Sequence, residues 1–136
     1  MPGSLIQNMS GLQDKQVVRI VKTEHLLWKW WLYNMMLGYH VVDEKQLVDH
    51  HQCRLGKWYD QARNRASLSS LDSFRAIDEP HQRFHRLAAE IYRLIRADKR
   101  AEAEKRLFEL EQASYQLVEN LDRLLSDLER GNTSGR

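Results

Sequence analysis

The last third of the chain carries an apolar repeat that constrains the fold more than any other feature. Its members recur at alternating steps of four and three residues: Ala103, Leu107, Leu110, Ser114, Leu117, Leu121, Leu124 and Leu128. These steps place all eight side chains on one face of an α-helix. The repeat therefore predicts a helix over about residues 99–130 that buries one seam against other helices.

The rest of the chain also favours helices. Its 136 residues include only two prolines and six glycines, and strong helix formers are plentiful. Periodic apolar positions predict a helix over 14–37 with Gly38 as its C-cap, and Pro80 and two preceding acids mark the start of another. A short helix over 50–65, capped by Asp49, is expected between them.

Short connections between amphipathic helices predict an all-α, antiparallel bundle of four main helices, with room for a short extra one. The chain length suits a single domain. We expect a flexible leader over 1–13, the bundle over 14–130 and a disordered tail over 131–136.

Charge and hydropathy exclude several classes of partner. The net charge is +2 and acids and bases alternate, whereas a nucleic-acid surface needs a one-signed basic patch. The most apolar stretch, residues 26–37, contains a lysine and is too short to span a bilayer. No secretory signal is visible, and a lone cysteine suits a reducing compartment. We therefore expect a cytoplasmic protein that neither inserts into membranes nor binds nucleic acid.

Three histidines and the single cysteine are the candidate chemical groups. His81 and His85 are four residues apart, so a helix presents both imidazoles on one face. His25 lies within the apolar stripe of the 14–37 helix, and Cys53 lies in the next predicted helix. Each residue alone is more often an ordinary core residue. Together, three nitrogens and one thiolate complete a tetrahedral donor set for Zn²⁺.

The chain resembles the chemoreceptor zinc-binding domain family in three elements. Histidine three residues before an aromatic occurs as His25–Trp28, and the central Cys-x-apolar-Gly-x-aromatic pattern occurs as Cys53–Trp58. The third element, His-x-x-x-His, occurs as His81–His85. The elements stand in order and the resemblance extends over about residues 14–130.

This resemblance implies a soluble helical bundle that binds one zinc ion through His25, Cys53, His81 and His85. It further implies a homodimeric cytoplasmic sensor, attached to a chemoreceptor or a diguanylate cyclase, that reports zinc or oxidants such as hypochlorous acid. No such partner domain is visible in this sequence, so a stand-alone module and a piece of a larger protein are both open.

Zinc requires a thiolate and neutral imidazoles, and we expect Cys53 to be the ligand that an oxidant removes. Carboxylates of Glu24, Asp78 and Glu79 are the predicted hydrogen-bond partners of the imidazoles. Other histidines near Cys53 are candidate substitute ligands, although solvated loop residues are the more common case: His40, His50 and His51.

Three other functions compete with a sensor. A zinc hydrolase needs an open coordination position, and a di-iron bundle needs several inward carboxylates, neither of which the sequence favours. We therefore predict no catalytic residue. The third alternative is a dimerisation bundle with a purely structural zinc. For the homodimer, the Trp30–Trp31 region and the leucine seam of the last helix are the candidate surfaces.

Overall fold

A computed structural model describes residues 14–39 and 53–134 of the chain. The helices are α2 (Asp14–Met36), α3 (Arg54–Ala62), α4 (Ala66–Ser69), α5 (Asp72–Arg75), α6 (Asp78–Arg96) and α7 (Arg100–Ser134). The predicted leader over 1–13, the predicted cap at Asp49 and three of the histidines lie outside the described residues: His40, His50 and His51.

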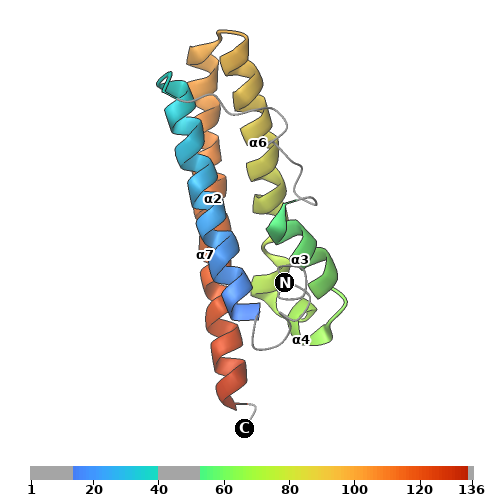
Figure 1. Cartoon of the computed structure of the whole chain (residues 1–136). Coiled ribbons are helices and arrows are strands. Elements are labelled where there is room, and N and C mark those ends of the chain that lie inside the picture. The colour runs from blue at the N-terminus through green and yellow to red at the C-terminus, as the bar shows by residue number, and fades with distance from the viewer. Residues whose placement is uncertain (1–13, 40–52, 135–136) are drawn as a thin grey trace, which may run out of the picture.

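The long helices form an antiparallel all-α bundle, as predicted. Helix α7 runs the length of the molecule, α2 lies beside it, and α6 turns back along its N-terminal half (Figure 1). The short helices α3, α4 and α5 gather beside the other half of α7 (Figure 1). None of the helices in the described part of the chain combines the length and hydropathy needed to cross a membrane.

Two of the long helices are followed by a residue with positive φ. After α2, Gly38 has φ 82°, and the amide of Tyr39 donates to the carbonyl of Asn34 at 2.9 Å, which is a Schellman motif. Asp98 has φ 60° after α6, and the amide of Lys99 donates to the carbonyl of Leu94 at 2.8 Å in the same arrangement. The predicted cap at Gly38 is therefore confirmed.

Several predicted boundaries differ from the structure. Helix α3 begins at Arg54 and ends at Ala62, so Cys53 is its N-cap rather than a residue of its first turn. The polar stretch after it contains two single-turn helices, α4 and α5. Helix α7 continues to Ser134, so most of the predicted disordered tail is helical. The added residues, 131–134, are weak helix formers, and the apolar repeat ends at Leu128, so the sequence carries no signal for this last turn.

The core consists of two large apolar clusters stacked along α7 and a small third one formed by Met35 and Tyr92. The lower cluster joins α2, α3, α5 and α7, and includes Val17, Val21, Leu55, Trp58, Phe74, Leu117 and Leu121. The upper cluster joins α2, α6 and α7, and includes Leu32, Phe84, Leu87, Ile91, Ala103, Leu110 and Ala113. Most of the α7 seam is fully buried within the protomer. The seam is therefore unavailable as a dimer surface, and that expectation was wrong.

Tyr59 fastens α3 to α5. Its ring stacks on Phe74 with centroids 4.1 Å apart, and its hydroxyl donates to the Phe74 carbonyl at 2.6 Å. Desolvation by burial, together with the nearby negative charge of Asp78, raises the pKa of Tyr59 to about 12. The folded protein therefore favours the neutral phenol.

We predict that the protein loses stability in alkali partly through this group. Because the folded pKa of Tyr59 lies above the ordinary value near 10, its contribution is intact below pH 10 and declines as the pH rises to about 12. Tyr59→Phe should cost about 1 kcal/mol at pH 7 through the lost hydrogen bond, and should flatten the decline. Urea unfolding at pH values from 7 to 11.5 measures both the cost at pH 7 and the decline in the free energy of unfolding with pH. The exposed Tyr115→Phe is the control, and an equally steep decline in Tyr59→Phe would contradict the prediction.

Candidate metal centre

Three helices bring the four predicted donor residues together. His25 comes from the middle of α2, Cys53 from the N-cap of α3, and His81 and His85 from the first two turns of α6. One nitrogen or sulfur atom from each residue lies within 4.8 Å of the others. His25 and His81 are buried, and Cys53 and His85 are partly exposed.

The closest donor pairs are already near coordination spacing. The Sγ atom of Cys53 lies 3.1 Å from Nε2 of His81, and Nε2 of His25 lies 3.4 Å from Nε2 of His85. The three imidazoles meet edge to face, with ring centroids 4.8 to 5.4 Å apart. The aromatic ring of Phe84, also on α6, contacts His25 with centroids 5.3 Å apart and gives the site an apolar wall.

A backbone bond sets the tautomer of His25. Its Nδ1 atom lies 2.8 Å from the carbonyl oxygen of Val21, and a carbonyl only accepts, so Nδ1–H is the donor. The lone pair of the neutral ring is then on Nε2, which faces the other donors. Desolvation by burial lowers the pKa of His25 and outweighs the opposing effect of the Val21 bond. Burial thus keeps the imidazole neutral, and the Val21 bond sets the tautomer that presents Nε2.

Cys53 occupies a position that favours the thiolate. Its Sγ atom accepts a hydrogen bond from the amide of Gly56 at 3.4 Å and caps α3. A helix N-terminus carries partial positive charge, which favours a negatively charged group placed there. The same hydrogen bond caps α3 and holds the sulfur atom near His81.

The three predicted carboxylate partners pair elsewhere. Glu24 lies 3.6 Å from Arg54, the amide of Gln82 donates to Asp78 at 3.2 Å, and Glu79 lies 3.5 Å from Arg83. At His25 the partner is instead the Val21 carbonyl. No sequence signal identifies that partner, because every residue inside a helix has a backbone carbonyl four residues before it.

A cavity of about 320 Å³ opens against one side of the cluster. The cluster residues His25 and Cys53 form part of its wall, and the rest comes from Glu24, Leu27, Trp28, Trp31 and Arg54. Because Cys53 is part of the wall, the cavity offers a small reagent a way to reach this residue.

The donor set fits zinc in both chemistry and spacing. Tetrahedral zinc, with bonds of about 2.0–2.1 Å to nitrogen and 2.3 Å to sulfur, separates its donor atoms by about 3.3–3.6 Å. The observed pairs at 3.1 and 3.4 Å are close to this, and all four donor atoms lie within 4.8 Å of one another. Mixed nitrogen and thiolate donors suit zinc rather than magnesium or calcium, which prefer oxygen.

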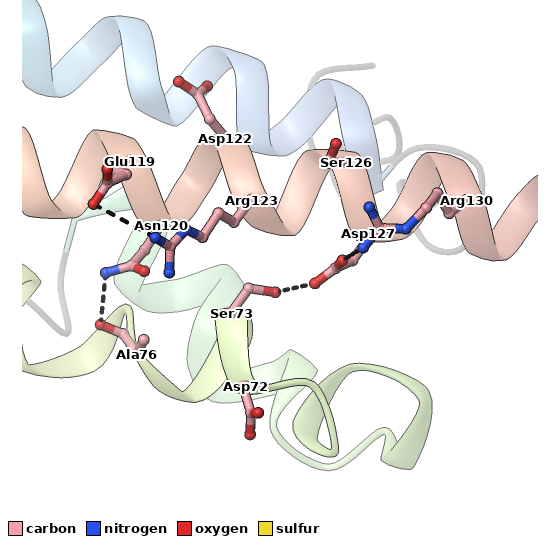
Figure 2. A pocket seen from close by; sticks show the side chains of 10 residues that line it. All are labelled: Asp72, Ser73, Ala76, Glu119, Asn120, Asp122, Arg123, Ser126, Asp127 and Arg130. Atoms are coloured by element: carbon pink, nitrogen blue, oxygen red, sulfur yellow. Dashed lines mark hydrogen bonds and ion pairs between the residues drawn. The ribbon is translucent and has the colours of Figure 1, made fainter.

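A larger cavity, of about 550 Å³, lies between α5 and α7 and contains none of the four donor residues (Figure 2). Its charged groups largely satisfy one another. Ser73 donates to Asp127 at 2.6 Å, Arg130 pairs with Asp127, and the amide of Asn120 donates to the Ala76 carbonyl at 3.3 Å (Figure 2). These bonds attach α5 to α7, which is a structural role.

Comparison with protein families decides the identity of the bundle. The family model of the chemoreceptor zinc-binding domain matches residues 25–92, which is half of the chain. The chain belongs to the chemoreceptor zinc-binding (CZB) domain family. The CZB match begins at His25 and includes all four donor residues. Searches among curated proteins and among solved structures give no match.

The matched segment is narrower than the stretch over 14–130 that the sequence suggested. It runs from His25 to Tyr92, near the end of α6, whereas α7 and the start of α2 lie outside it. Zinc is the metal of CZB domains, and the family is regulatory rather than catalytic. The helical bundle and the zinc expected from the sequence are thereby confirmed.

Proposed function

We propose that this CZB domain is a zinc-dependent sensory module in which His25, Cys53, His81 and His85 hold one zinc ion. The observation that carries the proposal is the convergence of four donor atoms, from three separate helices, to within 4.8 Å. Four protein donors fill a tetrahedral shell, which favours a closed regulatory site over a hydrolase with an open position. A cytoplasmic location suits the thiolate.

Ligand removal tests the assignment. We expect protein purified without added zinc to contain one zinc per chain, and Cys53→Ala or His81→Ala to bind zinc at least about 10- to 100-fold more weakly, since even supporting residues of zinc sites have effects of that size. Elemental analysis and competition with a chelator measure both quantities. Gln82→Ala, an exposed change between the two α6 histidines, is the matched control. Unchanged zinc content in Cys53→Ala would refute the ligand set.

Sensing is assigned to Cys53 because it is the only soft donor of the four. An oxygen-transferring oxidant such as hypochlorous acid converts the thiolate to sulfenic acid and is itself reduced to chloride. The adjoining cavity gives such a reagent access. When bound, zinc would supply the link between α3 and the other two helices, so loss of the thiolate frees α3 from the three histidines.

We therefore predict that stoichiometric hypochlorous acid releases zinc and raises hydrogen exchange over residues 53–65 more than over α7. A zinc-sensitive dye and mass spectrometry follow the two changes. Cys53→Ser, which lacks the oxidisable sulfur, is the control for oxidation elsewhere in the chain. If oxidised wild-type protein keeps both its zinc and its exchange pattern, Cys53 is not a redox sensor, and a purely structural zinc becomes the better description.

A homodimer is the proposed signalling unit, and α2 supplies the surface. Five exposed residues and the half-buried Asn34 recur at steps of three and four along α2 and the residue after it: Ile20, Thr23, Leu27, Trp30, Asn34 and Leu37. Trp30 is 57% exposed and Leu37 is 66% exposed. This spacing is typical of a helix that packs against a second helix. A chemoreceptor or a diguanylate cyclase is the proposed recipient of the signal.

The exposed α2 stripe gives a direct test of the dimer. We predict that Trp30→Glu shifts the protein from dimer to monomer in analytical ultracentrifugation, because a charge replaces a large apolar contact. Phe108→Glu on α7, which changes an aromatic residue of similar exposure, is the matched control. Dissociation by Phe108→Glu alone would place the interface on α7 instead.

A further inference from the structure

Asp14 is a buried carboxylate that the proposed zinc site does not use. It is the first residue of α2, and only 3% of its surface is exposed. The guanidinium of Arg65 donates to its two oxygens at 2.9 and 3.0 Å, and the indole N–H of Trp58 donates at 3.0 Å. We call these three residues the Asp14 cluster. Trp58 lies on α3, and Arg65 follows the end of that helix.

Helix α3 therefore meets α2 at two separated places. Near its start, Cys53 approaches the metal centre and Arg54 pairs with Glu24 at 3.6 Å. Near its end, the Asp14 cluster forms the second attachment. Asp14 and His25 are eleven residues apart, which is three helical turns, so both project from the same face of α2. The two attachments lie about 16 Å apart along the axis of α2 at 1.5 Å per residue.

These attachments fix the position of a helix that is too short to be stable alone. Helix α3 has nine residues, fewer than an isolated helix needs in water. Its apolar face packs in the lower core cluster, but apolar contacts are non-directional and tolerate sliding. A bidentate guanidinium–carboxylate pair imposes one geometry. The Asp14 cluster thus limits how α3 slides along α2, and with it the position of Cys53.

We propose that Asp14 and Arg65 are positioning residues for the Cys53 ligand, coupled to zinc through α3. Breaking the pair lets α3 shift and weakens zinc binding, although neither residue touches the donors. By thermodynamic linkage, bound zinc stabilises the Asp14 cluster by the same factor. Zinc binding therefore also stabilises the first turn of α2, which contains Asp14. The inference rests on the proposed zinc site and adds two residues to it. Asp14 lies outside the CZB match, and Arg65 lies inside the match but is not a metal ligand.

Charge removal at either end of the pair tests this coupling. We expect Asp14→Asn and Arg65→Gln each to raise the zinc dissociation constant about tenfold, the size of effect seen for supporting residues of zinc sites. Chelator competition gives the constant. In the metal-free variants, Cys53 should also react faster with a chromogenic disulfide reagent than in the metal-free wild type, a readout that requires no zinc.

Two controls separate positioning from general destabilisation. Asp122→Asn makes the same chemical change in the exposed Lys22–Asp122 pair between α2 and α7, and should leave both readouts unchanged. Leu110→Ala weakens the upper core cluster away from α3, and should lower the unfolding temperature without changing thiol reactivity. If Leu110→Ala changes zinc affinity as much as Asp14→Asn, the proposal is overturned.

Wild-type protein is measured first, because failure to bind zinc there refutes the zinc site itself. If the wild-type protein binds zinc and both variants have the same zinc dissociation constant and thiol reactivity, only the coupling is refuted. Arg65 has a partly exposed side chain, so Arg65→Gln provides the test even if Asp14→Asn does not fold. Arg65→Lys keeps the charge without the bidentate geometry, and should recover part of the lost affinity.

Discussion

The structure depends on a polar layer that separates two apolar clusters. On α2, Val21 belongs to the lower cluster and Leu32 to the upper, with His25 between them. On α6, His81 and His85 follow the lower-cluster residue Ile77 in the same way. Burying imidazoles at a core boundary is costly unless their nitrogens find partners. The convergence of four donors supplies those partners, and a bound cation would satisfy all of them at once.

Much of this arrangement could be predicted from sequence because it follows from helical periodicity. The alternating repeat of α7 and the four-residue step from His81 to His85 are local patterns, and a helix translates them directly into faces. The turn at Gly38 is equally local, since a left-handed residue after a helix favours glycine. The convergence of His25 with Cys53 is not local, and its prediction depended on recognising a family pattern.

The features that escaped prediction arise from tertiary contacts. Nothing in the sequence near Asp14 indicates that its carboxylate is buried against Arg65, 51 residues further along the chain. The partner of His25 proved to be a backbone carbonyl, and any helical residue offers one, so composition cannot identify it. The burial of the α7 seam within one protomer depends on how α2, α3 and α6 surround it, which a single-helix pattern leaves open.

The capping role of Cys53 has a consequence for the shape of the oxidised state. The same sulfur atom is both a candidate donor and the acceptor for the Gly56 amide at the start of α3. A sulfinate at this position carries two oxygens and a negative charge, which a helix N-terminus accommodates better than a thiol. Chemical damage to the metal centre would therefore strengthen the cap of α3. The first turn of α3 should therefore stay capped after oxidation, while the rest of the helix loses its link to the metal centre.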